Sequence, residues 1–218
     1  MHEFFDKLGA AAKRAAGNVA NEVSVAAEKQ KLSDAYKDLG KRYYKAVKIG
    51  ETAALAAEAL IRELHAEGFE DIRITSGYRS YEYQQILFNT YLGNEMKKHP
   101  DWTVEQCRAE VLTYSALPGE SEHQTGLCMD LISTKNVVLD ETFADNPAYA
   151  WLTENAHNFG FILRYPEGKE EYYGTDCTAG HFRYVGVDAA KYITENNLCL
   201  EEFLLLYDED IIHVPGIN

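Results

Sequence analysis

The chain has 218 residues, of which 46% are hydrophobic and 26% are charged, and its formal net charge is -14. This composition is ordinary for a globular protein, and the length suits one well-packed domain with an appendage rather than two large domains. The acidic balance makes nucleic acid and anionic lipid poor partners, because both carry negative charge that the protein surface would repel.

The first segment, residues 1–48, differs from the rest in having apolar side chains at helical spacing over two stretches. The positions are Leu8, Ala12, Ala15, Val19 and Val23, then Leu32, Ala35, Tyr36, Leu39 and Tyr43. This periodicity predicts one or two amphipathic helices that form an N-terminal arm. The arm would pack against the following domain or support self-association. A role at a membrane surface is less favoured, because many of the apolar positions are only alanine.

From residue 51 to residue 218 the pattern predicts a second, mixed domain. Helices are predicted over residues 51–67, 80–98, 103–115, 147–158 and 200–207. Strands are predicted over 71–76, 127–133, 161–165 and 181–186, with Ile72 and Ile74 on one face of the first. Because no regular βαβ repeat is present, the expected class is α+β, a small mixed or antiparallel sheet flanked by helices.

The compartment is predicted from what the sequence lacks. No run of 18 apolar residues occurs, so no transmembrane helix is expected. The N-terminus has no basic region, apolar run and cleavage site in the order of a signal peptide, which favours the cytoplasm unless another route, such as lysis, exports the protein. The cysteines at 107, 128, 177 and 199 form no C-x-x-C pair and are interpreted as reduced thiols.

The segment SEHQTGLCMDL, residues 121–131, holds the most informative polar residues. Asp130 lies within an apolar run, and a buried carboxylate is costly unless a partner neutralises it. A zinc ion would do so, because it accepts imidazole nitrogen and carboxylate oxygen and keeps one position open in a catalytic site. His123 in the preceding polar turn and His181 at the start of HFRYVG are the candidates for the other two ligands.

The same residues have an ordinary structural interpretation, which spacing alone leaves open. A buried aspartate most often pairs with arginine or lysine, and a single histidine is most often a residue with no ligand role. The other histidines have no comparable context and are interpreted as structural: His2, His65, His99, His157 and His213.

SEHQTGLCMDL resembles the Ser-x-His-x-x-Gly-x-x-x-Asp signature of the VanY-type D-Ala-D-Ala carboxypeptidases, a family of zinc D,D- and L,D-carboxypeptidases. SGYRSYEYQQILFN at 76–89 is similar to the family's substrate-binding segment, and FGFILRYPEGKE at 159–170 and HFRYVG at 181–186 are similar to its later blocks. The blocks occur in the family's order, and the resemblance covers about residues 51–207. Residues 1–48 lie outside it.

The resemblance implies roles for particular residues. His123, Asp130 and His181 would bind Zn²⁺, which polarises the scissile carbonyl and lowers the pKa of its bound water. Arg79, Gln84 and Ser121 match positions that hold the substrate's terminal carboxylate or the developing oxyanion; without the resemblance, Arg79 would be interpreted as an exposed arginine at a helix start. Tyr78 and Tyr83 would shape the pocket or pack structurally. The implied partner is a peptidoglycan stem peptide, or a precursor, that ends in D-Ala.

One departure from the family pattern concerns the general base. The family has a Glu three residues before the last zinc histidine and a bulky residue directly before it, whereas this chain has Thr178 and Gly180. A threonine hydroxyl cannot accept a proton near neutral pH. Asp176 is the candidate substitute base, with Glu170 and Glu171 as further nearby carboxylates. Cys177 is either an extra ligand or, as is commoner, a buried structural thiol.

Two functions compete on this basis. The first is a zinc carboxypeptidase, of D,D or L,D type, that releases terminal D-Ala with Arg79 and Asp176 in the catalytic machinery. The second is a catalytically impaired relative that keeps zinc and binds D-Ala-terminated peptides. The unchanged ligand and substrate positions favour the first, and Thr178 favours the second.

Overall fold

The computed structural model describes residues 48–139, 141–174 and 178–208. The chain divides into two units, Met1–Lys48 and Ile49–Asn218, and the following description concerns the second. Apart from Lys48, the predicted N-terminal arm lies outside the described residues and stays a prediction, as do the roles suggested for Asp176 and Cys177.

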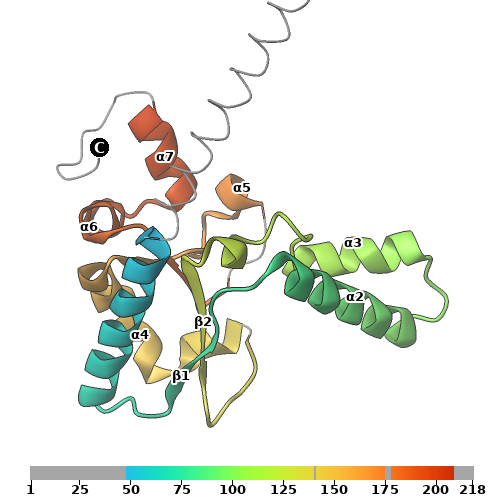
Figure 1. The fold of residues 1–218 in the computed structure, drawn as a ribbon, viewed down its shortest axis with the longest axis horizontal. Helices are drawn as coiled ribbons and strands as arrows, with labels where there is room; N and C mark the ends of the chain where they lie inside the picture. The colour runs from blue at the N-terminus through green and yellow to red at the C-terminus, as the bar shows by residue number, and fades with distance from the viewer. Residues whose placement is uncertain (1–47, 140, 175–177, 209–218) are drawn as a thin grey trace, which may run out of the picture. The chain divides into compact units, whose positions relative to one another are not determined.

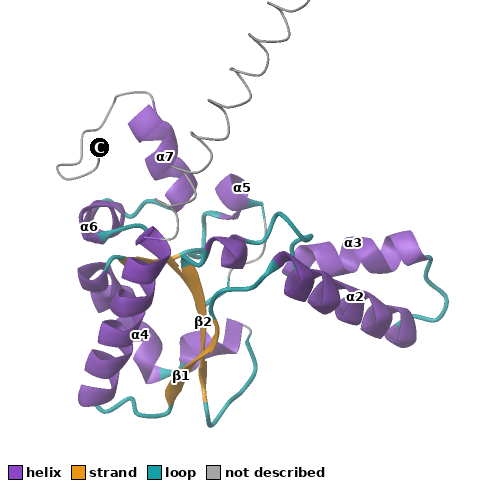
Figure 2. Cartoon of the chain, viewed as in Figure 1, coloured by secondary structure: helices purple, strands orange, loops and turns teal. Residues whose placement is uncertain are grey.

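A four-stranded antiparallel sheet forms the centre of the domain, in the order β1-β2-β4-β3. The strands are β1 (Ile72–Ser76), β2 (Cys128–Ser133), β3 (Phe161–Leu163) and β4 (His181–Tyr184). Each overlaps a strand predicted from the sequence. The combination of an antiparallel sheet with separate helices confirms the α+β class (Figure 2).

The helices lie around this sheet, and α2 and α3 pack side by side as a pair to one side of it (Figure 1). Residues 48–66 form the first helix. The others are α2 (Tyr81–Lys98), α3 (Val104–Tyr114), α4 (Pro147–Asn155), α5 (Glu170–Tyr173), α6 (Val187–Glu195) and α7 (Leu200–Asp208). Short 3₁₀ turns are η1 (Glu122–Thr125), η2 (Glu141–Asp145) and η3 (Ala156–Phe159). None of the helices in the described ranges is long and apolar enough to span a bilayer.

Local sequence signals explain where the helices begin. Ser80 caps α2, since its hydroxyl accepts the backbone N–H of Tyr83 at 3.1 Å. Thr103 and Gln106 form a reciprocal capping box at the start of α3. Asn146 caps α4, whose first residue is Pro147, a position where proline loses no hydrogen bond.

The sheet separates the main core from the candidate site, because side chains alternate between the faces of a strand. Met129 and Leu131 of β2 and Phe182 of β4 enter the main core, whose other members come from residues 57–64, β1, η2, α4, η3, β3 and the residues just before β4. Asp130 and His181, which are paired in register, occupy the alternate positions of the same strands. A second, smaller cluster joins β3 to α6 and α7 through Ile162, Ala189, Ala190, Ile193, Leu200 and Phe203.

The structure departs from the sequence predictions in two places. Ile72 is fully buried, as expected, but Ile74 is 40% exposed. Ile74 pairs regularly with Leu131, and the register shifts only between Ile74 and Ser76. Ile74 nevertheless lines a pocket between β1 and the first helix rather than the core. The pattern also gave no prediction for α5 and α6, which the structure contains.

Gly180 lies in a position with no room for a side chain. A Cβ there would come 2.6 Å from the Leu131 carbonyl oxygen and 2.9 Å from Leu139 Cδ1. That carbonyl cannot easily move, since the Leu131 N–H donates to the Gly180 carbonyl at 2.8 Å. We expect Gly180→Ala to destabilise the fold by about 1–3 kcal/mol, measured as the midpoint of denaturant unfolding.

The matched control is Gly93→Ala in α2, where an added Cβ meets nothing within 4 Å. It is expected to raise stability by about 0.5–1 kcal/mol, because alanine loses less backbone entropy than glycine in a helix. Equal unfolding midpoints for Gly180→Ala and the unaltered protein would contradict the prediction.

Candidate metal centre

Three buried side chains from separate elements converge in the middle of the sheet. His123 comes from η1, Asp130 from β2 and His181 from β4, and their exposed fractions are 4%, 2% and 7%. His123 Nε2 is 3.2 Å from Asp130 Oδ2, and His181 Nδ1 is 2.8 Å from Asp130 Oδ1. One ligand atom from each lies within 4.8 Å of the others. The structure therefore brings together the three residues that the sequence singled out as ligands.

Backbone contacts fix which nitrogen of His123 faces the centre. Its Nδ1 lies 2.7 Å from the carbonyl oxygen of Gly77, which can only accept, so Nδ1 carries the proton. Nε2 is the ring nitrogen that is directed at Asp130. The His123 carbonyl in turn accepts the N–H of Arg79 at 3.1 Å, which joins η1 to the loop after β1.

The charges at the centre are arranged around one carboxylate, that of Asp130. Burial raises the pKa of the Asp130 carboxyl, but hydrogen bonds from His123 and His181 outweigh burial and hold that pKa well below its usual range. Burial lowers the pKa of His181, but the bond to Asp130 raises it well above the ordinary value. Asp130 is thus anionic and surrounded by groups that compensate its charge. Two imidazoles and one carboxylate form a donor set that suits zinc and leaves a position for water.

Arg79 also reaches this centre, so it is not the exposed helix-start arginine of the alternative interpretation. Its Nη2 donates to Asp130 Oδ2 at 2.7 Å, and its Nε donates to Ser76 Oγ at 2.8 Å. A longer contact of 3.5 Å joins Nη1 to Gln84 Oε1. The guanidinium is 16% exposed and is held beside the candidate ligands by strand, helix and loop.

The other two candidate substrate residues, Gln84 and Ser121, are both buried. Gln84 is 1% exposed, and its amide nitrogen donates to the Ala116 carbonyl at 2.8 Å. Together with its contact to Arg79, this makes Gln84 a bridge between the arginine and the segment after α3. Ser121 is buried directly before η1, and its hydroxyl does not cap that turn. Their proposed contacts with substrate stay predictions.

Sequence reasoning missed a charged network on the far side of His181. Glu122 Oε1 accepts Arg164 Nε at 2.8 Å, and Glu122 Oε2 lies 3.3 Å from Arg183 Nη1. Arg164 also donates two hydrogen bonds, of 2.5 and 3.0 Å, to the carboxylate of Glu201 in α7. The signal was present: Arg164 directly follows the apolar strand FIL, and an arginine that is 6% exposed requires partners.

Besides this network, the structure adds Tyr165 to the site. Its ring centroid is 5.2 Å from that of His181, and the Arg164 guanidinium lies 4.7 Å from its ring. Burial, together with the nearby Glu122 charge, raises the pKa of Tyr165 to about 12. The phenol is therefore neutral at physiological pH and forms part of the wall beside His181.

The candidate bases that the structure describes differ in their surroundings. Thr178 is half-buried, and its carbonyl accepts the His181 N–H at 3.4 Å. Glu170 and Glu171 begin the short helix α5 and are exposed. Glu122 is the carboxylate beside His181, but it is a poor proton acceptor. Burial raises the pKa of this carboxyl, but the contacts with His181 and Arg164 outweigh burial and hold the pKa well below its usual range.

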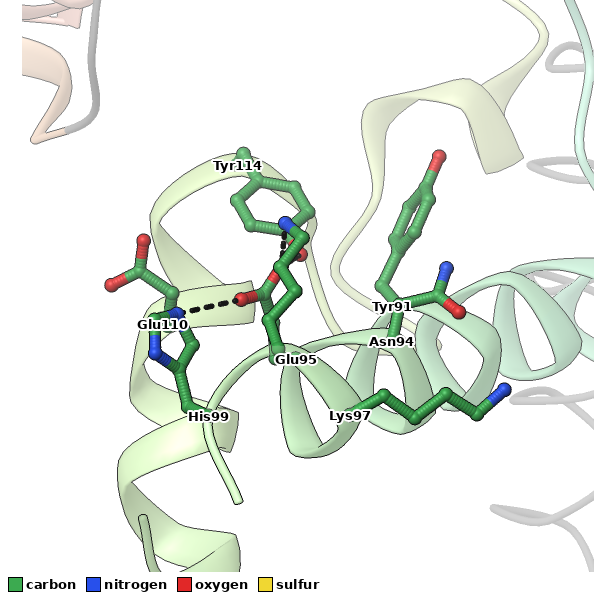
Figure 3. Close-up of a pocket in the computed structure, with 8 residues that line it drawn as sticks. Tyr91, Asn94, Glu95, Lys97, His99, Glu110 and Tyr114 are labelled. Carbon is green, nitrogen blue, oxygen red and sulfur yellow. Dashed lines mark hydrogen bonds and ion pairs between the residues drawn. The ribbon is translucent and has the colours of Figure 1, made fainter. Parts of the chain in front are cut away.

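A pocket of 670 Å³ lies elsewhere, between α2 and α3 (Figure 3). Its floor carries the buried Glu95 carboxylate, which accepts Lys98 at 2.7 Å and the Tyr114 hydroxyl at 3.2 Å. Burial raises the pKa of Tyr114 to about 12. The lining includes neither a candidate ligand nor Arg79, so this pocket is separate from the candidate centre.

Comparison with known proteins agrees with this geometry. Residues 46–187 match the family model for VanY, D-alanyl-D-alanine carboxypeptidase. The putative carboxypeptidase YodJ of Bacillus subtilis (strain 168) is 40% identical over 156 residues, which is 71% of this chain and 53% of YodJ. The chain belongs to the VanY D-alanyl-D-alanine carboxypeptidase family, and it spans about half the length of this curated relative.

Solved structures share the fold. A mutant of the vancomycin resistance D,D-pentapeptidase VanY, in complex with Zn(II), is 36% identical with a TM-score of 0.59, over 70% of this chain and 81% of the other. VanYB in complex with D-alanine-D-alanine is 37% identical with a TM-score of 0.60, over 70% and 80% of the two chains. The first of these relatives therefore contains zinc, and the second binds a D-Ala dipeptide.

Proposed function

We propose that this protein is a zinc carboxypeptidase that releases terminal D-Ala from peptidoglycan stem peptides or their precursors. The observation that carries the proposal is the buried cluster of His123, Asp130 and His181 in a member of the VanY family. The zinc complex of a related D,D-pentapeptidase and the D-Ala-D-Ala complex of VanYB support the metal and the substrate class.

In this proposal His123 Nε2, an Asp130 oxygen and His181 Nδ1 hold the zinc ion. Bound zinc would polarise the scissile carbonyl and make water a better nucleophile near neutral pH. The two hydrogen-bonded histidines and the sheet register hold the ligands in place before the metal arrives. A site that is organised in advance needs little rearrangement on binding.

Arg79 is proposed to bind the terminal carboxylate of the peptide or to stabilise the developing oxyanion. A guanidinium has five N–H donors, and its contacts with Ser76, Gln84 and Asp130 use three of them. The remaining donors suit an anionic oxygen, and the fixed fork gives direction to the contact.

The proton of the attacking water needs an acceptor, for which we propose Asp176. Its position in the sequence is five residues before His181. The carboxylate would take the proton from water as the carbonyl is attacked and would pass it to the departing D-Ala amine. Glu170 and Glu171 are the further candidates for this role, and Glu122 is excluded because its low pKa makes it a weak base.

A second candidate function is peptide binding without turnover. The observation that favours it is Thr178, which occupies the position where the family pattern has its catalytic Glu. Loss of a general base typically lowers the rate about 10²–10⁴-fold. Zinc and peptide binding would survive such a loss, because neither requires the base.

The test is D-alanine release from synthetic stem tetrapeptides and pentapeptides by the zinc-loaded protein, followed by mass spectrometry. We expect release that a chelator abolishes and added zinc restores. The tetrapeptide reports L,D cleavage and the pentapeptide reports D,D cleavage. An inert protein that holds one zinc and binds the peptides in calorimetry would contradict the proposed activity and establish the second candidate.

A further inference from the structure

We propose that Glu122 positions the zinc ligand His181 by accepting a hydrogen bond from the Nε2 atom of its ring, and that Arg164 and Arg183 hold Glu122 in place. The inference rests on the metal site of the proposed function. It adds a positioning residue that lies beyond the three ligands.

His181 presents its two nitrogens to different neighbours. Nδ1 faces the centre, 2.8 Å from Asp130 Oδ1, whereas Nε2 is buried on the other side of the ring and has no hydrogen-bond partner. A metal on Nδ1 leaves the ring proton on Nε2, which then becomes a donor. A buried donor needs an acceptor, and metal-bound histidines almost always find one in a carboxylate, a carbonyl or water.

Glu122 supplies the nearest carboxylate. Its Oε2 lies 3.8 Å from His181 Nε2, somewhat longer than a hydrogen bond, on the side of the ring away from Asp130. A small rotation of the ring on metal binding would close this gap. Because Glu122 immediately precedes His123, the η1 turn would then carry one ligand directly and orient a second.

The two arginines restrict where the Glu122 carboxylate can go. Arg164 Nε binds Oε1 at 2.8 Å, and Arg183 Nη1 lies 3.3 Å from Oε2. Arg164 is 6% exposed and is itself anchored by Glu201 of α7. The carboxylate is therefore fixed from two directions, with one oxygen directed at His181.

Two other interpretations of this cluster are weaker. Cys128 is near enough to His181 to serve as the acceptor, but its Sγ donates to Glu122 Oε2 at 3.2 Å, and sulfur is a weak acceptor. Glu122, Cys128 and His181 also have the geometry of a second metal site. A second cation is disfavoured there because the positive Arg164 and Arg183 already contact the same carboxylate.

The experiment measures the affinity of the 218-residue chain for Zn²⁺ and Co²⁺ by competition with a chromophoric chelator. Glu122→Ala is expected to weaken binding about 10–100-fold, the usual effect of removing a residue that orients a metal-bound histidine. Glu122→Gln should recover part of this loss, since an amide oxygen still accepts from Nε2. The Co²⁺ absorption spectrum should shift in Glu122→Ala, because the orientation of one ligand changes.

Two controls separate positioning from general destabilisation. Glu201→Gln weakens the same Arg164 network without touching His181, so it should lower the unfolding midpoint but not the metal affinity. Cys128→Ala should bind metal as the unaltered protein does. Unchanged affinity and spectrum in Glu122→Ala would overturn the inference, as would an equal loss in Cys128→Ala or two metal equivalents per chain. Failure of the unaltered protein to bind zinc would instead contradict the proposed function, which requires the metal.

Discussion

His123→Ala is expected to reduce bound zinc from one equivalent per chain to none, the largest effect predicted for this protein. The variant removes the proposed ligand from η1 and leaves Asp130 and His181, whereas catalytic zinc sites use three protein ligands. The measurement is metal content by mass spectrometry after dialysis against a weak chelator. D-Ala release should disappear together with the metal.

His99→Ala is the matched control for this loss. His99 is a histidine at the end of α2, outside the candidate metal centre. It stacks on Trp102 and pairs with Glu95. It should keep its full zinc content. Because His123 also bonds to Gly77, circular dichroism of the metal-free proteins must show that both variants are folded. A folded His123→Ala protein that retains one zinc would rule out the proposed ligand set.

If Thr178 marks a missing base, as in the second candidate function, Thr178→Glu is expected to raise D-Ala release by about 10²–10⁴-fold, the usual contribution of a general base, whereas no gain is expected if Asp176 already serves. The substitution places a carboxylate three residues before His181, whose N–H contacts the Thr178 carbonyl. The measured quantity is kcat/KM on the better of the two stem peptides. Zinc content should not change, since residue 178 is not a proposed ligand.

Thr178→Gln separates proton transfer from a change of shape. Glutamine has nearly the same size as glutamate but cannot act as a base, so its activity should equal that of the unaltered protein. Equal gains in both variants would show that the pocket, rather than the base, had limited the rate. If Thr178→Glu gave no gain while Asp176→Asn abolished activity, Asp176 would already serve as the base.

Much of the fold could be predicted from local patterns. The apolar run around Met129 and Leu131 predicted β2, and the helices predicted over 80–98 and 147–158 correspond to α2 and to α4 with η3. Ile74 shows the limit of such reasoning. Alternation places it on the same face as Ile72, but its exposure depends on how far the first helix covers β1, which is a tertiary property.

The candidate site could be predicted where the sequence placed a charged residue in an apolar strand. Asp130 stands out because a carboxylate in an apolar strand requires compensation, and the structure provides His123, His181 and Arg79. The role of Glu122 was not visible, because a glutamate in a polar turn is normally solvated. Its contacts with Arg164, 42 positions later in the chain, exist only once β3 and β2 share a sheet.

The strand order also has a consequence for how the protein is made. β4 follows the other three strands of the described sheet in sequence, yet it lies between β2 and β3, so this sheet has no continuous hydrogen bonding until residues 181–184 join it. During synthesis the ribosome would therefore release β1, β2 and β3 before β4, which joins β3 to the other two strands, and before His181, the third proposed ligand. The nascent chain cannot close the sheet or assemble the proposed metal centre until residues 181–184 have been made, and such non-local pairing is slow.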